Sequence, residues 1–200
     1  MYLFCSDLEG VFVPEVWINV AEKTGIPELR RTTRDEPDYD KLMHYRMKIL
    51  DERGLKLHHI QEVIAQIRPL PGAVEFLEWV KERMQLIVVS DTFIQFADPL
   101  MKQLNRPTLF CHTLVMDDTN RIIDYKLRQP DPKRRTIEAL QSLKYQVIGM
   151  GDSYNDISMI KQADQGILFR PPDNVVKDYP ELPVTHDYEE VKKIVSGLLG

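Results

Sequence analysis

The stretch Phe4–Glu15 reads FCSDLEGVFVPE and carries three carboxylates within nine residues, on Asp7, Glu9 and Glu15. Asp7 follows the apolar run YLFC and one serine, a pattern typical of the end of a short buried strand. Clusters of acidic side chains usually lie on solvated helix faces, whereas this cluster adjoins an apolar segment and a glycine. Carboxylates gathered in a partly buried cleft are stable only with raised pKa values or a bound cation. The stretch therefore predicts that a cation belongs beside these residues.

Two further apolar runs end on polar residues in the same way. QLIVV leads into Ser90 and Asp91, and YQVIGM leads into Gly151 and Asp152. Because the carboxyl ends of parallel strands meet at one edge of a sheet, and ligands bind outside that edge, we expect Asp7, Ser90 and Asp152 to be neighbours. The alternative is that each acid only caps the helix that follows it. One strand alone would favour that alternative, but three strands that end alike favour a shared site.

The rest of the chain alternates between strand patterns and helix patterns. Strand patterns occupy residues 2–6, 85–91, 108–118, 121–128, 145–151 and 163–169, with a hairpin turn at 118–120. Helix patterns occupy residues 16–25, 38–54, 56–67, 73–83, 92–104, 131–143, 153–163 and 188–199. Pro99 is expected to bend or end the helix that contains it. Strands that alternate with helices of this length predict an α/β fold, with a parallel sheet covered by helices on both faces.

The segment between the first two strands interrupts this alternation. Residues 14–68 read as helical throughout, and the pattern changes only after the turn-forming run PLPG at 69–72. We therefore predict two domains. Residues 1–13 and 69–200 would form the α/β core, and residues 14–68 would form a small helical cap inserted after the first strand.

Composition limits the kinds of partner. The chain has 200 residues, of which 43% are hydrophobic and 28% charged, and these values are ordinary for a soluble globular protein. Its net charge of −5 argues against a nucleic-acid surface, which would normally be basic, but does not exclude a phosphorylated ligand. No run approaches the ~20 apolar residues of a membrane helix and no signal peptide is visible, so we expect a cytoplasmic protein. Cys5 and Cys111 lie in apolar surroundings and are expected to be free thiols.

Four motifs, in this order, resemble those of the haloacid dehalogenase-like (HAD) phosphatase superfamily. They are DLEGV at 7–11, VVSD with Ser90, DPKR with Lys133 and GDSYND at 151–156. The family pattern has DxDx[TV] after the first strand, Ser or Thr after the second, Lys before a later helix, and an acidic GDxxxD motif. The resemblance implies a Rossmann-like core with a parallel sheet and a small helical cap, in agreement with the order of strand and helix patterns.

The resemblance assigns the phosphoryl-transfer chemistry to residues of these motifs. Asp7 would be the nucleophile that forms an aspartyl-phosphate. Glu9 would act first as the general acid that protonates the leaving alkoxide and then as the general base that activates water. Ser90 and Lys133 would hold the transferring phosphoryl oxygens. Taken alone, Lys133 would instead be interpreted as a solvated surface lysine.

The same resemblance implies a Mg²⁺ cofactor, since hard divalent cations take carboxylate, water and phosphate oxygens as ligands. The metal would be held by Asp7, the main-chain carbonyl of Glu9, and Asp152. Asp156 would act as a further ligand, directly or through a water.

Within the superfamily the whole chain looks like the phosphoserine phosphatases, and most of all like the bifunctional phosphoserine phosphatase/homoserine phosphotransferases of pseudomonads. The likeness rests on DLEGV, PDYD, LRQPDPKR, GDSYND and GILF. It implies O-phospho-L-serine as substrate and homoserine as a second phosphoryl acceptor. Glu15 and Arg46 would bind the amino-acid end, with the planar guanidinium on the carboxylate, and Asn155 would touch substrate or phosphate. Arg46 could instead be an exposed arginine paired with Asp40 or Glu52.

The sequence departs from the family pattern at three places. Glu9 stands where the family has Asp, and its side chain is one methylene longer. Asp91 stands where phosphoserine phosphatases usually have Gly. We expect Asp91 to cap the helix at 92–104, and the alternative is that it binds substrate or phosphate. Glu15 follows the nucleophile one position sooner than in that family.

Two other functions stay open from the sequence. One is a related phosphatase for another small phosphate ester, which a short cap would admit. The other is a phospho-accepting receiver domain, which also uses clustered acids, a hydroxyl and a lysine on an α/β sheet. Receivers carry the acceptor Asp after the third strand and have no helical insert after the first, so the pattern does not favour them. The sequence leaves the oligomeric state open, with a homodimer as one option.

Overall fold

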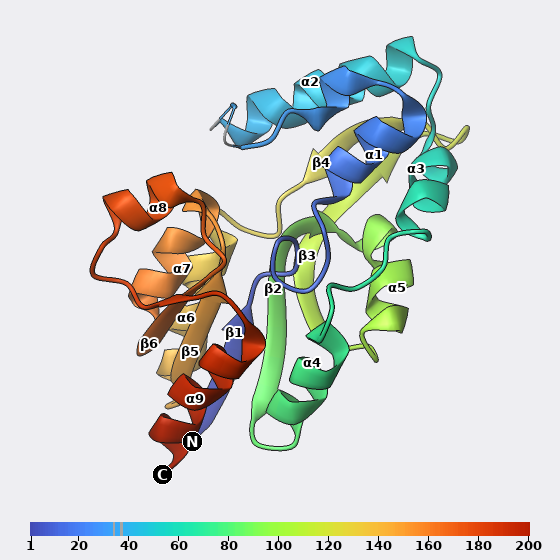
Figure 1. Cartoon of the computed structure of the whole chain (residues 1–200). Helices are drawn as coiled ribbons and strands as arrows, with labels where there is room; N and C mark the ends of the chain where they lie inside the picture. The colour runs from blue at the N-terminus through green and yellow to red at the C-terminus, as the bar shows by residue number, and fades with distance from the viewer. Residues whose placement is uncertain (34, 37) are drawn as a thin grey trace.

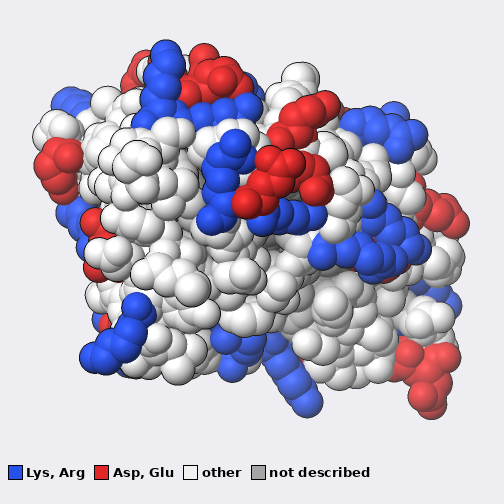
Figure 2. Space-filling view, turned by 90° about the horizontal axis from the view of Figure 1, so that it is seen from below, with Lys and Arg blue, Asp and Glu red and all other residues white. Residues whose placement is uncertain are grey.

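The computed structural model of the chain describes residues 1–33, 35–36 and 38–200. Arg34 and Pro37, which fall inside the predicted cap, lie outside the described residues. Among the residues that are described, no helix is long and apolar enough to cross a membrane. Figure 2 shows the molecule of Figure 1 from below, and basic and acidic side chains are interspersed on this face.

A seven-stranded sheet in the order β4-β3-β2-β1-β5-β6-β7 forms the centre of the molecule (Figure 1). Its strands are β1 (Tyr2–Ser6), β2 (Gln85–Phe93), β3 (Thr108–Met116), β4 (Ile122–Lys126), β5 (Gln146–Gly151), β6 (Gln165–Phe169) and β7 (Val184–Thr185). Neighbouring strands pair in parallel except β3 and β4, which form the predicted antiparallel hairpin. The predicted α/β class is confirmed. Because β1 lies between β2 and β5, the polar ends of these strands come together at one edge.

Alternate residues of β1 point to opposite faces of the sheet and build a core on each. The helices that follow the insert are α4 (Ala73–Lys81), α5 (Ile94–Gln103), α6 (Pro132–Ser142), α7 (Ile157–Gln162), α8 (Asp173–Asp178) and α9 (Tyr188–Leu199), with the 3₁₀ helix η2 (Tyr154–Asp156) before α7. Phe4 packs in one core with residues of α4, α5 and α9, whereas Leu3 and Cys5 pack in the other with α6 and α7. Burial of both faces explains why these strands read as continuous apolar runs.

The helices α1 (Val16–Thr24), α2 (Tyr39–Glu52) and α3 (Leu57–Ile64), with the 3₁₀ helix η1 (Pro27–Arg30), form a helical insert between β1 and α4. In Figure 1 this insert lies beyond the carboxyl ends of the central strands. The β3–β4 hairpin holds it there: Tyr125 donates its hydroxyl to Asp40 at 2.6 Å, and Arg121 forms an ion pair with Asp51 at 3.0 Å. The insert thus faces the edge where the acidic residues gather. The predicted domain boundaries stay predictions.

Three short elements were not predicted from the sequence, and the boundary between β2 and α5 lies two residues later than expected. The elements η1, α8 and β7 are too short to show a periodic pattern. Strand β2 runs two residues further than predicted, to Phe93, so α5 begins at Ile94 rather than at Thr92. Pro99 does not end α5, which continues to Gln103.

A side chain of the insert replaces the helical hydrogen bond that Pro99 removes. Pro99 has no N–H to offer to the carbonyl of Gln95, four residues earlier in α5. The side-chain amide of Gln61, in α3, donates to that carbonyl at 2.7 Å. The contact satisfies the carbonyl and ties the insert to a helix of the core.

We expect Gln61→Leu to lower the free energy of unfolding by about 1 kcal/mol, since a neutral hydrogen bond contributes roughly that amount. Urea denaturation of Gln61→Leu in the wild-type and the Pro99→Ala backgrounds tests whether Gln61 replaces the hydrogen bond that Pro99 removes. Pro99→Ala supplies a backbone donor for the carbonyl of Gln95, so Gln61→Leu should cost less there. An equal loss in both backgrounds would contradict the explanation.

Candidate active site

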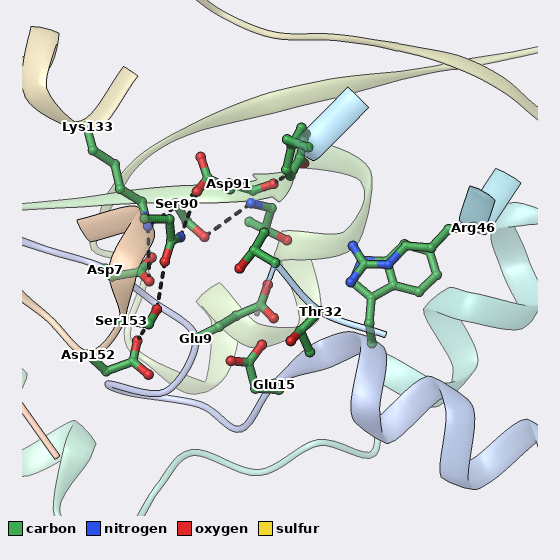
Figure 3. A pocket seen from close by; sticks show the side chains of 15 residues that line it. Asp7, Glu9, Glu15, Thr32, Arg46, Ser90, Asp91, Lys133, Asp152 and Ser153 are labelled. Atoms are coloured by element: carbon green, nitrogen blue, oxygen red, sulfur yellow. Dashed lines mark hydrogen bonds and ion pairs between the residues drawn. The ribbon is translucent and has the colours of Figure 1, made fainter. Parts of the chain in front are cut away.

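The carboxyl ends of β1, β2 and β5 meet, and their polar residues line one pocket together with residues of the insert (Figure 3). The lining residues are Asp7, Glu9, Glu15, Trp17, Thr32, Thr33, Tyr39, Arg46, Ser90, Asp91, Thr92, Lys133, Asp152, Ser153 and Asn155. Of the residues singled out from the sequence, Asp156 alone does not line the pocket. It is fully buried and contacts Lys133 and Asp152.

A tight loop after β1 presents the first acids to the pocket. The N–H of Asp7 donates to the carbonyl of Met150 in β5 at 2.9 Å, which anchors the start of the loop. Gly10 has a φ of +75°, and a Cβ at this position would lie 2.6 Å from the carboxylate of Asp152. Both the backbone conformation and the closeness of Asp152 therefore require glycine here.

Lys133 lies at the centre of the acidic residues. Its Nζ is 2.7 Å from Asp156, 3.1 Å from Asp7 and 3.4 Å from Asp91, and its side chain is 2% exposed. Burial by itself would lower the pKa of a lysine, but the three carboxylates outweigh this effect and raise the pKa of Lys133 well above its usual value. Lys133 is a buried cation. The alternative of a solvated surface lysine is wrong.

Both oxygens of the Asp156 carboxylate are engaged inside the protein. One accepts a hydrogen bond from Lys133 at 2.7 Å. The other accepts from the backbone N–H groups of Asp152 at 3.0 Å and Ser153 at 3.2 Å. Asp156 thereby fixes both the ammonium of Lys133 and the turn that carries Asp152.

The acidic cluster fits a hard divalent cation. Asp7, Asp152 and Asp156 are buried, and one carboxylate oxygen from each lies within 4.8 Å of the others. Burial and the neighbouring carboxylates, Asp156 first among them, raise the pKa of Asp7 well above its ordinary value, although Lys133 opposes this shift. A cation with a preference for oxygen ligands would relieve this repulsion. The donor set therefore suits a metal of the predicted kind.

Glu9 lies between the acidic cluster and Arg46 (Figure 3). Its carboxylate accepts a hydrogen bond at 2.8 Å from the N–H of Val16, the first residue of α1. Burial and then the nearby Glu15 raise the pKa of Glu9 to about 8, against the lowering effects of the Val16 N–H and Arg46. Glu9 is therefore mainly protonated at neutral pH, which is the state that a general acid needs.

Arg46 reaches the pocket from α2 and is buried, with 5% of its surface exposed. Its guanidinium lies 4.6 Å above the ring of Trp17, and its Nη2 donates to the carbonyl of Arg31 at 2.8 Å. Its Nε is buried and has no hydrogen-bond partner among the described residues. The alternative of an exposed arginine paired with Asp40 or Glu52 is wrong, because α2 turns this side chain inward.

Asp91 does not cap α5, contrary to the expectation from the sequence. It lies within β2, which pairs with β3 as far as Phe93, and the chain therefore stays extended past Asp91. The Asp91 carboxylate accepts from the amide of Asn155 at 2.9 Å and lies 3.4 Å from the Nζ of Lys133. Burial would raise the pKa of Asp91, but Lys133, His112 and Asn155 together lower it below its ordinary value.

Several residues around the pocket were not assigned a role from the sequence. Thr32, Thr33 and Tyr39 reach it from the insert, and Tyr39 donates its hydroxyl to the main-chain carbonyl of Asp91 at 2.9 Å. Glu15, which the resemblance singled out, lies near Thr32 in Figure 3. The places of these residues depend on how the insert docks against the core, and no local motif encodes that docking.

Comparisons with known proteins agree with this geometry. A profile of the haloacid dehalogenase-like hydrolases matches residues 12–164. The phosphoserine phosphatase ThrH of Pseudomonas aeruginosa is 56% identical over 193 residues, which cover 96% of this chain and 94% of that protein. A phosphoserine phosphatase of Pseudomonas syringae pv. tomato is 57% identical over 189 residues, which cover 94% of this chain and 80% of that protein.

The fold is also found among solved structures. A phospho-aspartyl intermediate analogue of a phosphoserine phosphatase has a TM-score of 0.79 at 20% identity, with 96% of this chain and 97% of that chain covered. The chain therefore belongs to the haloacid dehalogenase-like hydrolases, and within them it groups with the phosphoserine phosphatases. The resemblance drawn from the four motifs is confirmed.

The raised pKa of Glu9 predicts a pH-dependent stability of the metal-free protein. Glu9 has a pKa of about 8 in the folded protein against an ordinary value of 4.5, so folding takes up a proton between these pH values. Its stabilising contribution is complete below the ordinary pKa and is lost as the pH rises through about 8.

Glu9→Gln keeps the shape of the side chain and cannot ionise. In EDTA at about pH 8.5, we expect its free energy of unfolding to exceed that of the wild type by more than ~1 kcal/mol. At about pH 4 the two proteins should differ little, because Glu9 is then protonated in both states. Urea denaturation at both pH values measures the gap. A gap that does not change with pH would show that the pKa of Glu9 is not raised.

Proposed function

We propose that the protein is a Mg²⁺-dependent phosphoserine phosphatase that forms an aspartyl-phosphate on Asp7 and also transfers the phosphoryl group to homoserine. One observation carries the proposal. The carboxylate of Asp7 lies 3.1 Å from the buried ammonium of Lys133, in a pocket that is also lined by the buried Arg46. The similarity to two pseudomonad phosphoserine phosphatases supports the choice of substrate.

The first half-reaction moves the phosphoryl group from the serine oxygen to Asp7. A carboxylate oxygen of Asp7 attacks phosphorus, a new P–O bond forms, and the bond to the serine oxygen breaks. The leaving alkoxide takes a proton from Glu9, which its pKa of about 8 keeps protonated at neutral pH. Ser90 and Lys133 would bind the phosphoryl oxygens, over which negative charge is spread in the transition state.

The second half-reaction returns the site to its starting state. Glu9, now ionised, takes a proton from a water molecule whose oxygen attacks phosphorus. The bond from phosphorus to Asp7 breaks and inorganic phosphate leaves. The same group therefore acts as acid in one step and as base in the next, and each step leaves it in the protonation state that the other needs.

Mg²⁺ would be held by Asp7, Asp152 and the main-chain carbonyl of Glu9. When bound, the ion would offset the negative charge of the phosphate and the carboxylates. Both oxygens of Asp156 are engaged by Lys133 and by backbone N–H groups, so we assign Asp156 to the metal only through a water.

The far part of the pocket suits the amino-acid end of the substrate. Arg46 is buried with its Nε unpartnered, so a carboxylate placed against it would receive charge-assisted hydrogen bonds. Glu15 lines the same pocket and would accept the ammonium group. Asn155 donates to Asp91, and its carbonyl oxygen accepts from the hydroxyl of Ser153 at 2.6 Å, so we assign it to the wall of the pocket.

Transfer to homoserine follows from the same arrangement. An aspartyl-phosphate can be attacked by any hydroxyl held in the place of the attacking water. Homoserine carries the amino and carboxyl groups of serine and has one more methylene before its hydroxyl. Glu15 and Arg46 could therefore hold either amino acid by the same end, and Glu9 would take the proton from the attacking hydroxyl.

A HAD phosphatase for another small phosphate ester is the second candidate. The presence of Asp91 where phosphoserine phosphatases usually have glycine favours it, because this carboxylate lines the pocket. A receiver domain is not supported, because Asp7 follows β1 and the helical insert comes directly after it. A cytoplasmic location and a homodimer stay predictions.

Activity on phosphoserine should require Mg²⁺, and Asp7→Asn should abolish it while the protein stays folded, because a neutral amide cannot attack phosphorus. Phosphate release from a panel of small phosphate esters, with Mg²⁺ and with EDTA, measures both effects. Asp98→Asn, which changes an exposed carboxylate of α5 that does not line the pocket, is the matched control. An Asp7→Asn enzyme with even about a tenth of the wild-type rate would refute the covalent mechanism.

Arg46→Ala should weaken the binding of phosphoserine about 10- to 100-fold, as expected for the loss of a charge-assisted contact. Hydrolysis of p-nitrophenyl phosphate, which has no carboxylate, should change much less. KM and kcat for both substrates test this, with Arg53→Ala at the exposed end of α2 as control. Equal losses on both substrates would assign Arg46 to folding of the insert or to phosphate binding.

Enzyme supplied with phosphoserine and homoserine should form homoserine phosphate, and Glu9→Gln should impair both transfer and hydrolysis, because both need the same acid and base. Mass spectrometry of the products separates the two outcomes. Inorganic phosphate as the sole phosphorylated product at saturating homoserine would mean a plain phosphatase, and the transferase activity would then be rejected.

A further inference from the structure

His112 is a buried imidazole at the edge of the site. It lies in β3, opposite Phe93 of β2, and its side chain is 1% exposed. Its ring packs against those of Tyr39 and Phe93, with centroid distances of 6.3 Å in each case. It has no place in the four sequence motifs or in the reaction steps described above.

A hydrogen bond at Nδ1 fixes the neutral tautomer of the ring. Nδ1 accepts a hydrogen bond from the backbone N–H of Arg128 at 3.2 Å, so Nδ1 carries no proton. The ring proton therefore lies on Nε2, which faces Oδ1 of Asp91 at 3.4 Å. His112 can donate to Asp91 without a positive charge.

The second oxygen of Asp91 reaches the reacting centre. It accepts from the amide of Asn155 at 2.9 Å and lies 3.4 Å from the Nζ of Lys133, which is itself 3.1 Å from Asp7. One carboxylate thus joins the buried imidazole on one side to the lysine beside the nucleophile on the other.

We propose that His112 is a positioning residue that acts through Asp91 on Lys133 and Asn155. The Asp91 side chain is 28% exposed, and without a donor on Oδ1 it would be held only through its other oxygen, so that it could turn toward solvent more easily. Lys133 would then lose one of the three carboxylates that hold its ammonium next to Asp7. The inference rests on the proposed function, in which Lys133 binds the transferring phosphoryl group.

Three substitutions separate the hydrogen bond from the packing of the ring. His112→Phe keeps an aromatic ring and removes the donor. His112→Gln keeps an amide N–H near the place of Nε2, whereas His112→Asn puts the amide near Nδ1 and cannot reach Asp91. Asn and Gln are therefore a matched pair that differ mainly in how far the side-chain amide extends toward Asp91. Their comparison shows whether a donor to Asp91 is needed, even if the Phe variant folds poorly.

The measurement is the single-turnover rate constant for phosphorylation of the enzyme by p-nitrophenyl phosphate with Mg²⁺. A first-order rate constant does not depend on the fraction of enzyme that is folded. We expect His112→Phe and His112→Asn to lower this rate constant about tenfold, which is less than the effect of removing a donor that itself stabilises the transition state. The rate constant of His112→Gln should stay within about threefold of the wild-type value. A Gln variant as slow as the Phe variant would overturn the proposal.

A double-substitution experiment tests the route through Asp91. In an Asp91→Ala background, the carboxylate that His112 is proposed to position is absent. There, His112→Phe should change the rate constant less than about twofold. An equal loss with and without Asp91 would mean that His112 acts by packing alone, and the inference would be wrong. Because the probe carries no amino acid, a failure on phosphoserine alone would reject only the proposed substrate. An inactive wild-type enzyme would overturn both proposals.

Discussion

A buried ammonium group surrounded by carboxylates is the interaction on which the site depends. The Nζ of Lys133 lies within 3.4 Å of Asp7, Asp91 and Asp156, and the lysine side chain is 2% exposed. Any one of these charges would be costly to bury alone, and they are stable only as a group. They come from α6, the loop after β1, strand β2 and the 3₁₀ helix after β5. The cluster therefore fixes how the elements at this edge of the sheet sit relative to one another.

The cluster carries more negative charge than one lysine can offset. Asp156 engages both of its oxygens with Lys133 and backbone N–H groups. Asp91 is held by Lys133 and Asn155. Asp7 and Asp152 line the pocket, and one carboxylate oxygen from each lies within 4.8 Å of the other. A cation bound between these two carboxylates would offset part of the excess negative charge, next to the carboxylate that is proposed to attack phosphorus.

Local patterns were enough to predict the strands that carry the site and the meeting of Asp7 with Asp152, because burial on both faces of a parallel sheet leaves long apolar runs with polar ends. The role of Asp91 could not be predicted in this way. Nothing in the run SDT distinguishes a helix cap from a strand that continues, and the pairing of Phe93 with His112 in the neighbouring strand decides it. Thr32, Thr33 and Tyr39 of the insert were missed for a similar reason, since docking onto the β3–β4 hairpin places them.

Glutamate at position 9 links the chemistry to the insert. Its carboxylate accepts from the N–H of Val16 at the start of α1, at 2.8 Å, and an aspartate, one methylene shorter, would have to give up either this contact or its present place in the pocket. The next residue of α1 is Trp17, over which the guanidinium of Arg46 lies at 4.6 Å. One helix therefore positions both the acid next to the reacting centre and the cation at the far end of the pocket. In the proposed reaction, a ligand carboxylate bound by Arg46 would therefore help to set the distance from Glu9 to the leaving oxygen.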